Sequence, residues 1–153
     1  MKIIRVAKRY KYVFAVLTFA VILLMIIVGL FSVDNSTNEV IVDYIEDLGW
    51  EIEATPKEIT HLTIPKQFDA VYETYNAVQK RSGFDLEEFK GKKVTRYTYR
   101  VLNHKESKNT RVVAGVFVFE NTIIAGDISS TDMNGFLHAI TETSNIIRKI
   151  PIF

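Results

Sequence analysis

The residues of this chain that could do acid–base chemistry are a histidine and the carboxylates near it. His138 and Glu142 stand one helical turn apart, and Asp127 or Asp132 could complete an acid–base group with them. A hydrolase would use His138 in this way. Exposed helices commonly carry such pairs without any chemical role, and we therefore expect no catalytic residue and no enzyme.

The other two histidines give no metal or cofactor site. His61 lies in an alternating segment and His104 in a polar one, and neither has a partner at the spacing of a metal-ligand set. Gly115 and Gly126 belong to apolar segments and not to a glycine-rich phosphate loop. We expect no metal and no cofactor.

Three arginines offer a different chemistry. Arg96, Arg100 and Arg111 fall on or beside two predicted strands and could cluster on a sheet near the loop that joins these strands. Such a cluster suits an anionic ligand, because guanidinium groups bind carboxylates and phosphates through paired hydrogen bonds. The alternative is a solvated strand face that pairs with neighbouring carboxylates.

A run of apolar residues from Val13 to Val33 contains no charged side chain. At about 1.5 Å per residue, a helix of this length crosses a hydrocarbon core of roughly 30 Å. The run is longer than the apolar part of a cleaved signal peptide, and the chain has no cysteine for lipid attachment. We predict an uncleaved transmembrane helix at 13–33.

Charge is distributed unevenly on the two sides of this run. Five of the 19 basic residues and no acidic residue precede it, which leaves 14 basic residues against 18 acidic ones in the remainder. Short segments rich in Lys and Arg stay in the cytoplasm. This predicts a cytoplasmic N-terminus at 1–12 and an extracytoplasmic domain at 34–153, at the cell membrane. Because the domain is mildly acidic, we expect no nucleic-acid partner.

Periodicity predicts an α+β domain after the span. In chain order, the patterns indicate a helix at 36–48, strand segments at 50–54 and 59–64, a helix at 66–82, a capped turn at 85–89, strands at 94–102, 111–119 and 122–128, and a final helix that begins near Met133. The tail at 146–153 has no clear pattern. We expect an antiparallel sheet of about four strands with helices packed mainly on one face, cystatin-like by analogy.

Glu120-Asn121 fits a two-residue hairpin turn. If Phe119 then faces Thr122, Phe117 faces Ile124 and Gly115 faces Gly126. Two opposed glycines would leave a shallow trough in the sheet, which a helix or an aromatic ring would fill.

The two faces of the expected sheet suggest two kinds of binding site. On one face, the helix at 66–82 would cover Tyr97, Tyr99 and Phe117, and a pocket between helix and sheet would be lined by four tyrosines. These candidate ligand-binding residues are Tyr72, Tyr75, Tyr97 and Tyr99. The same aromatic stripe is typical of a packed core. The other face is apolar and needs a cover, and its candidate partner contacts are Val112, Ala114, Val116 and Val118.

Several short motifs resemble those of a small family of uncharacterised bacterial domains. They are Gly49-Trp50-Glu51-Ile52, Ile64-Pro65, Phe68 with Tyr72, Tyr75-Asn76, Gly83-Phe84-Asp85-Leu86, Gly91-Lys92, Arg96-Tyr97-Thr98-Tyr99, Gly126-Asp127-Ile128 and Gly135-Phe136. The resemblance extends over roughly 40–135. It implies a single-pass, membrane-anchored protein of Gram-positive bacteria. It implies no catalytic residue, because the function of that family is unknown.

These observations favour a non-enzymatic protein-interaction module of the cell envelope, which binds another protein or its own copy through the second sheet face. The alternative is a sensor domain that binds a small ligand near the four tyrosines. A hydrolase is the third hypothesis.

Overall fold

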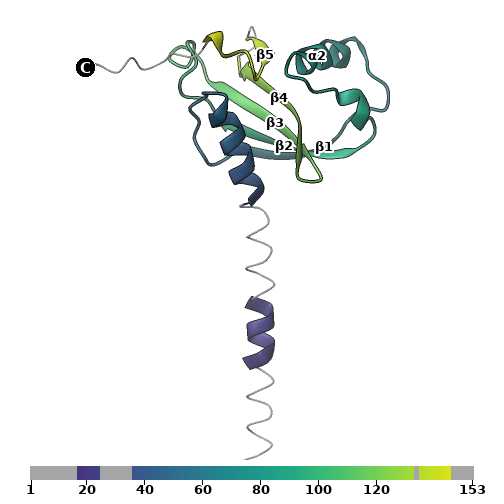
Figure 1. Ribbon diagram of the computed structural model, residues 1–153, viewed down its shortest axis with the longest axis vertical. Coiled ribbons are helices and arrows are strands. Elements are labelled where there is room, and N and C mark those ends of the chain that lie inside the picture. The colour runs from purple at the N-terminus through teal and green to yellow at the C-terminus, as the bar shows by residue number, and fades with distance from the viewer. Residues whose placement is uncertain (1–16, 25–35, 133–134, 146–153) are drawn as a thin grey trace, which may run out of the picture. The chain divides into compact units, whose positions relative to one another are not determined.

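The computed structural model describes residues 17–24, 36–132 and 135–145 (Figure 1). The chain divides into two compact units, Met1–Thr37 and Asn38–Phe153. In the first unit, residues 17–24 are helical and exposed. No helix among the described residues is long and apolar enough to span a membrane. The rest of the predicted span at 13–33, the predicted cytoplasmic segment at 1–12 and the tail at 146–153 lie outside the described residues.

The second unit is built on an antiparallel sheet with the strand order β1-β2-β3-β4-β5. The strands are β1 (Glu58–Thr63), β2 (Lys93–Arg100), β3 (Val112–Phe119), β4 (Thr122–Ser130) and β5 (Leu137–Ala139). The α+β class is confirmed, and the sheet has five strands where about four were expected. Ile52, in the first predicted strand segment, forms an isolated bridge with Val101.

The additional strand is β5, which lies where the final helix was predicted. Its pairing with β4 places Ala139 opposite Asp127 and Leu137 opposite Ser129. Phe136 and Ile140 both pack against the same apolar cluster. A separation of four residues satisfies a helix and a strand equally, so this spacing could not identify the strand.

Helix α2 (Ala70–Arg81) begins four residues after its predicted start. The carboxylate of Asp69 accepts a hydrogen bond from the backbone N–H of Tyr72 and so caps the helix there. The helix ends at Arg81 with Ser82 as its C-cap, and Gly83 follows with φ of +83°, a conformation that glycine adopts without a steric penalty. A 3₁₀ turn, η1 (Leu86–Phe89), comes next, and a second one, η2 (Thr143–Asn145), closes the described chain.

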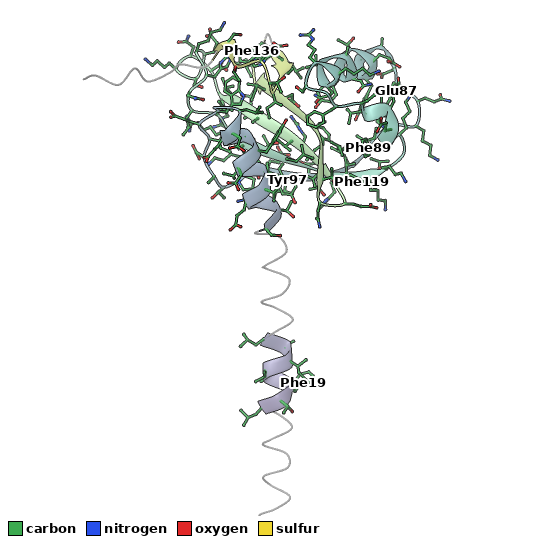
Figure 2. The ribbon with its side chains drawn as sticks, viewed as in Figure 1. Phe19, Glu87, Phe89, Tyr97, Phe119 and Phe136 are labelled. Atoms are coloured by element: carbon green, nitrogen blue, oxygen red, sulfur yellow. The ribbon has the colours of Figure 1, made fainter. Side chains whose placement is uncertain are left out.

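Apolar clusters cover both faces of the sheet. One cluster joins the helix at 36–47, through Ile41 and Ile45, to side chains of β2, β3 and β4. The other joins α2 and η1 to Val94, Phe117 and Ala125 on the opposite face. Figure 2 labels Tyr97 in the first cluster, and Phe89 and Phe119 in the second. The expectation that helices lie mainly on one face is therefore wrong.

The β3–β4 hairpin confirms the predicted turn and corrects the predicted register. Glu120 and Asn121 both have positive φ, and Phe119 faces Thr122. A bulge at Phe117/Val118 then shifts the pairing by one residue. Since a shift of one residue moves a side chain to the other face, the two predicted pairs beyond the bulge, Phe117 with Ile124 and Gly115 with Gly126, do not form. Phe117 faces Ala125, Gly115 faces Asp127, and Gly126 faces Val116.

Candidate functional site

The half of one sheet face that lies beyond Phe117 and α2 forms an open cleft of about 610 Å³. Residues of β2, β3 and β4 and the segment before β1 line it. Its basic residues are Lys57, Arg96, Arg100 and Arg111. Its other residues are Glu58, Thr98, Val113, Ser129, Ser130 and Thr131. We call this the basic cleft. The three arginines singled out in the sequence therefore share one site.

Arg96 is held at the inner end of the basic cleft. Its guanidinium group lies 3.7 Å from the carboxylate of Asp127 and 5.6 Å from the ring centre of Phe117. It also occupies the space above Gly115, where an added Cβ atom would stand 2.5 Å from Nη2. About a third of the side chain is exposed. Gly115 is therefore needed for close approach, and the predicted glycine trough is replaced by this arginine.

Asp127 is fully buried and joins the cleft to α2. Its Oδ1 accepts a hydrogen bond of 2.6 Å from the hydroxyl of Tyr75, and its Oδ2 accepts one of 3.2 Å from Ser129. Burial raises the pKa of Asp127, while Arg96 and the two hydroxyl donors act in the opposite direction. Burial and the neighbouring carboxylate raise the pKa of Tyr75 well above its usual value, so Tyr75 remains a hydrogen-bond donor.

The carboxylates near the basic cleft are fewer than its cations. Glu53 pairs with both Lys57 and Arg100. Within the described ranges, Asp127 forms an ion pair with Arg96 and with no other cation. Arg111 forms no ion pair with any residue of the described ranges. The cleft therefore combines a fixed arginine with an unpaired one.

A second polar group lies between β5 and the loop before β3. The Nε2 atoms of His104 and His138 are 3.5 Å apart, and both rings are buried beside Trp50 and Phe136. Nδ1 of His104 accepts the backbone N–H of Glu106, so the proton of the neutral ring is on Nε2. A pocket of about 440 Å³ opens beside the pair.

Hydrogen bonding also fixes the other ring of this pair. Nδ1 of His138 faces the carbonyl oxygen of Ala139 at 3.0 Å and must donate to it, which leaves Nε2 as an acceptor for His104. With these tautomers, both ring nitrogens of His104 take part in hydrogen bonds. Among the described residues, no group of three or more His, Cys, Asp or Glu could hold a metal ion.

The acid–base group considered around His138 does not form in the structure. Glu142 is 3.1 Å from Arg81 of α2 instead. Asp127 pairs with Tyr75 and Arg96 on the other side of the sheet. The cause is that His138 belongs to β5 and not to a helix, so its ring does not lie one turn from Glu142.

The four candidate ligand-binding tyrosines are divided between the two faces. Tyr72 and Tyr75 pack in the cluster of α2, whereas Tyr97 and Tyr99 pack under the helix at 36–47. Among the described residues, the four tyrosines line no common pocket, because β2 directs Tyr97 and Tyr99 away from α2. The four candidate partner contacts also lie in the cluster of the helix at 36–47, and all four are buried: Val112, Ala114, Val116 and Val118.

Sequence reasoning missed several residues of these sites, and their signals differ in strength. Asp127 is the one charged residue in the otherwise apolar and small segment at 123–130, which could have marked it as a buried functional carboxylate. Ser129, Ser130 and Thr131 lie directly before the predicted final helix, where residues of these types commonly cap a helix. The meeting of His104 with His138 left no sequence signal, because 34 residues separate them.

Comparison with known proteins gives one match. No curated protein and no solved structure matches the chain. Residues 44–128, more than half of the chain, match a family described as a domain of unknown function, DUF4830. This segment contains Tyr75, Arg96, Arg111 and Asp127. The chain belongs to this family of uncharacterised domains.

Proposed function

We propose that the chain is a single-pass membrane protein of a Gram-positive cell envelope, with the second unit outside the cell. The apolar run at 13–33 and the five basic residues before it support this location. The resemblance to membrane-anchored domains supports it as well.

We propose further that the domain is a non-enzymatic binding module and that its ligand is a small molecule held in the basic cleft. The observation that carries this proposal is the convergence of four cationic side chains, from β2, the segment before β1 and the segment before β3, on one cleft. A volume of about 610 Å³ falls in the range of small-molecule sites. The proposal keeps the sensor hypothesis and moves its site from the tyrosines to the arginines.

Thermal unfolding of the full-length protein, in detergent and with a panel of small ligands, tests this proposal. The panel should contain sugars, amino acids, carboxylates and phosphate esters. In Thr98→Trp, an indole fills the floor of the cleft. In the matched control Val71→Trp, the indole lies on α2, where Val71 is 76% exposed. A ligand that raises the unfolding temperature of the wild type and the control, but not of Thr98→Trp, supports the proposal. If no ligand in the panel behaves in this way, the proposal is refuted.

A protein partner or a second copy is the other candidate, and the edge strand β1 favours it. Five of the six residues of β1 are exposed, and β1 has a neighbour on one side only. Edge strands can add a strand from a partner. Crosslinking in native membranes should then yield a complex that Ile59→Lys removes and that Glu88→Lys, on η1, retains. Equal yields from both variants would exclude this role of β1.

A further inference from the structure

The basic cleft carries a surplus of positive charge that its own carboxylates do not balance. Four basic side chains line it, together with one carboxylate, Glu58. A solvated strand face typically pairs each cation with a neighbouring carboxylate. Here Glu53 is shared by Lys57 and Arg100, and Arg111 has no ion-pair partner among the described residues. The surplus predicts an anionic ligand.

The cleft also offers more hydrogen-bond donors than a carboxylate needs. Ser130 Oγ accepts the backbone N–H of Asp132, so its own hydrogen remains available. Thr98 also lines the cleft, between Arg96 and Arg100 in the sequence of β2. A carboxylate has two oxygen atoms in one plane, and a single arginine can satisfy both of them. Donors that come from β2, from β4 and from Arg111 before β3 suit a tetrahedral oxyanion with three terminal oxygens.

Arg96 is positioned before any ligand arrives. Asp127, the ring of Phe117 and the surface of Gly115 hold its guanidinium group on three sides. Its Nε is buried and has no hydrogen-bond partner among the described residues, while a third of the side chain is exposed. A side chain that is already ordered loses little entropy on binding, which favours affinity.

We infer that the basic cleft binds the phosphate group of a small phosphate ester, an inference that rests on the binding function proposed above. Arg111 and Arg100 bind the phosphate oxygens, and Arg96 supplies a fixed positive charge at the inner end. The cleft, at about 610 Å³, is much larger than a phosphate group, so the organic part of the ester occupies the remainder. A soluble ester and a lipid headgroup are the two sources of such a phosphate, and the experiment separates them.

Calorimetric titration of the full-length protein in phosphatidylcholine nanodiscs tests this inference with a matched series of probes. The probes are phenyl phosphate, phenyl sulfate, benzoate and phenol. We expect phenyl phosphate to bind most tightly, and its affinity to fall as salt is raised. Arg111→Gln should weaken this binding at least about tenfold, because a charged hydrogen-bond donor is lost. Arg81→Gln, on α2 and outside the cleft, is the control and should bind like the wild type.

A second titration in nanodiscs that contain phosphatidic acid identifies the source of the phosphate. If the lipid competes and phenyl phosphate no longer binds, the natural ligand is a lipid headgroup. If phenyl phosphate binds as before, the ligand is a soluble ester. Both results support a phosphate site.

Three results would overturn the inference. The first is that phenyl sulfate, benzoate or phenol binds as tightly as phenyl phosphate. The second is that Arg81→Gln weakens the binding as much as Arg111→Gln does. The third is that no probe binds. Thermal unfolding of both variants shows whether they are folded. If a sugar or an amino acid stabilises the wild type but not Thr98→Trp, the binding function stands and the phosphate assignment alone fails.

Discussion

Nε2 of His104 lies 3.5 Å from Nε2 of His138, and the tautomer of each ring is set by the backbone group at its Nδ1. The pair connects the loop before β3 to the edge strand β5. A proton added to His104 would go to Nδ1 and face the backbone N–H of Glu106, a second donor. The neutral form of His104 is therefore favoured in the folded domain.

We predict that the domain loses stability as the pH falls below about 6.5, the ordinary pKa of histidine. Burial lowers the pKa of His104, as do His138 and Lys105, while Glu106 acts in the opposite direction. The unfolded chain binds a proton at a higher pH than the folded chain does, so the stability present above pH 6.5 is lost on acidification. Urea unfolding between pH 5 and 7.5, followed by the fluorescence of Trp50, measures this loss. His104→Gln should reduce the slope of the unfolding free energy against pH. An equal slope in that variant would contradict the assignment of the pH dependence to His104.

We predict that Val116→Glu unfolds the domain and does not merely abolish an association. Val116 is completely buried under the helix at 36–47, and a carboxylate there would have no cation beside it. An unpaired buried charge costs about 3–5 kcal/mol. Urea unfolding of the full-length protein gives the change in the free energy of unfolding. Val71→Glu, at an exposed position of α2, is the control. A folded Val116→Glu protein of normal stability would show that this face is open.

We predict that Gly115→Ala weakens the binding of phenyl phosphate several-fold with a loss of stability of about 1 kcal/mol. The new methyl group would overlap the guanidinium group of Arg96, which must move away from Asp127. The displaced atoms are the end of a flexible side chain, so the fold tolerates the change. In an Arg96→Gln background the same substitution should have little further effect. Additive losses in the double variant would mean that Gly115 acts through something else.

We predict that Asn76→Ala destabilises the domain by about 2–3 kcal/mol. The Asn76 amide is buried, accepts the backbone N–H of Leu86 at 2.8 Å and donates to Asp85 at 2.9 Å. Alanine would leave the N–H of Leu86 buried and unpaired. Thermal unfolding measures the change, and Thr74→Ala, on an exposed position of α2, is the control. Equal effects of the two substitutions would show that the link between α2 and η1 contributes nothing specific.

Local patterns predicted most of the elements, because turns and caps depend on adjacent residues. Glu120-Asn121 predicted the hairpin turn, and the helix predicted at 66–82 ends within one residue of the end of α2. The bulge at Phe117/Val118 could not be predicted, because every residue around it is apolar and either register buries them. That single shift decided which residue faces Gly115 and therefore where Asp127 and Arg96 meet.

The candidate site was predicted in part, and the difference follows from distance along the chain. Arg96 and Arg100 are four residues apart on β2, so alternation alone places them on one face. The partners of Tyr97 and Tyr99 were misassigned because the sequence does not say which helix covers which face. Trp50 and His104 were not associated with β5, because a helix was expected there.

The hydrogen bond from Trp50 Nε1 to the carbonyl oxygen of Ile140 spans 90 residues and is 2.7 Å long. During synthesis, the helix at 36–47 and Trp50 are made before Ile140, which shares their apolar cluster. A growing chain that has not yet reached β5 therefore leaves this cluster incompletely covered and the indole N–H without its acceptor. Exposed apolar surface of this kind favours aggregation.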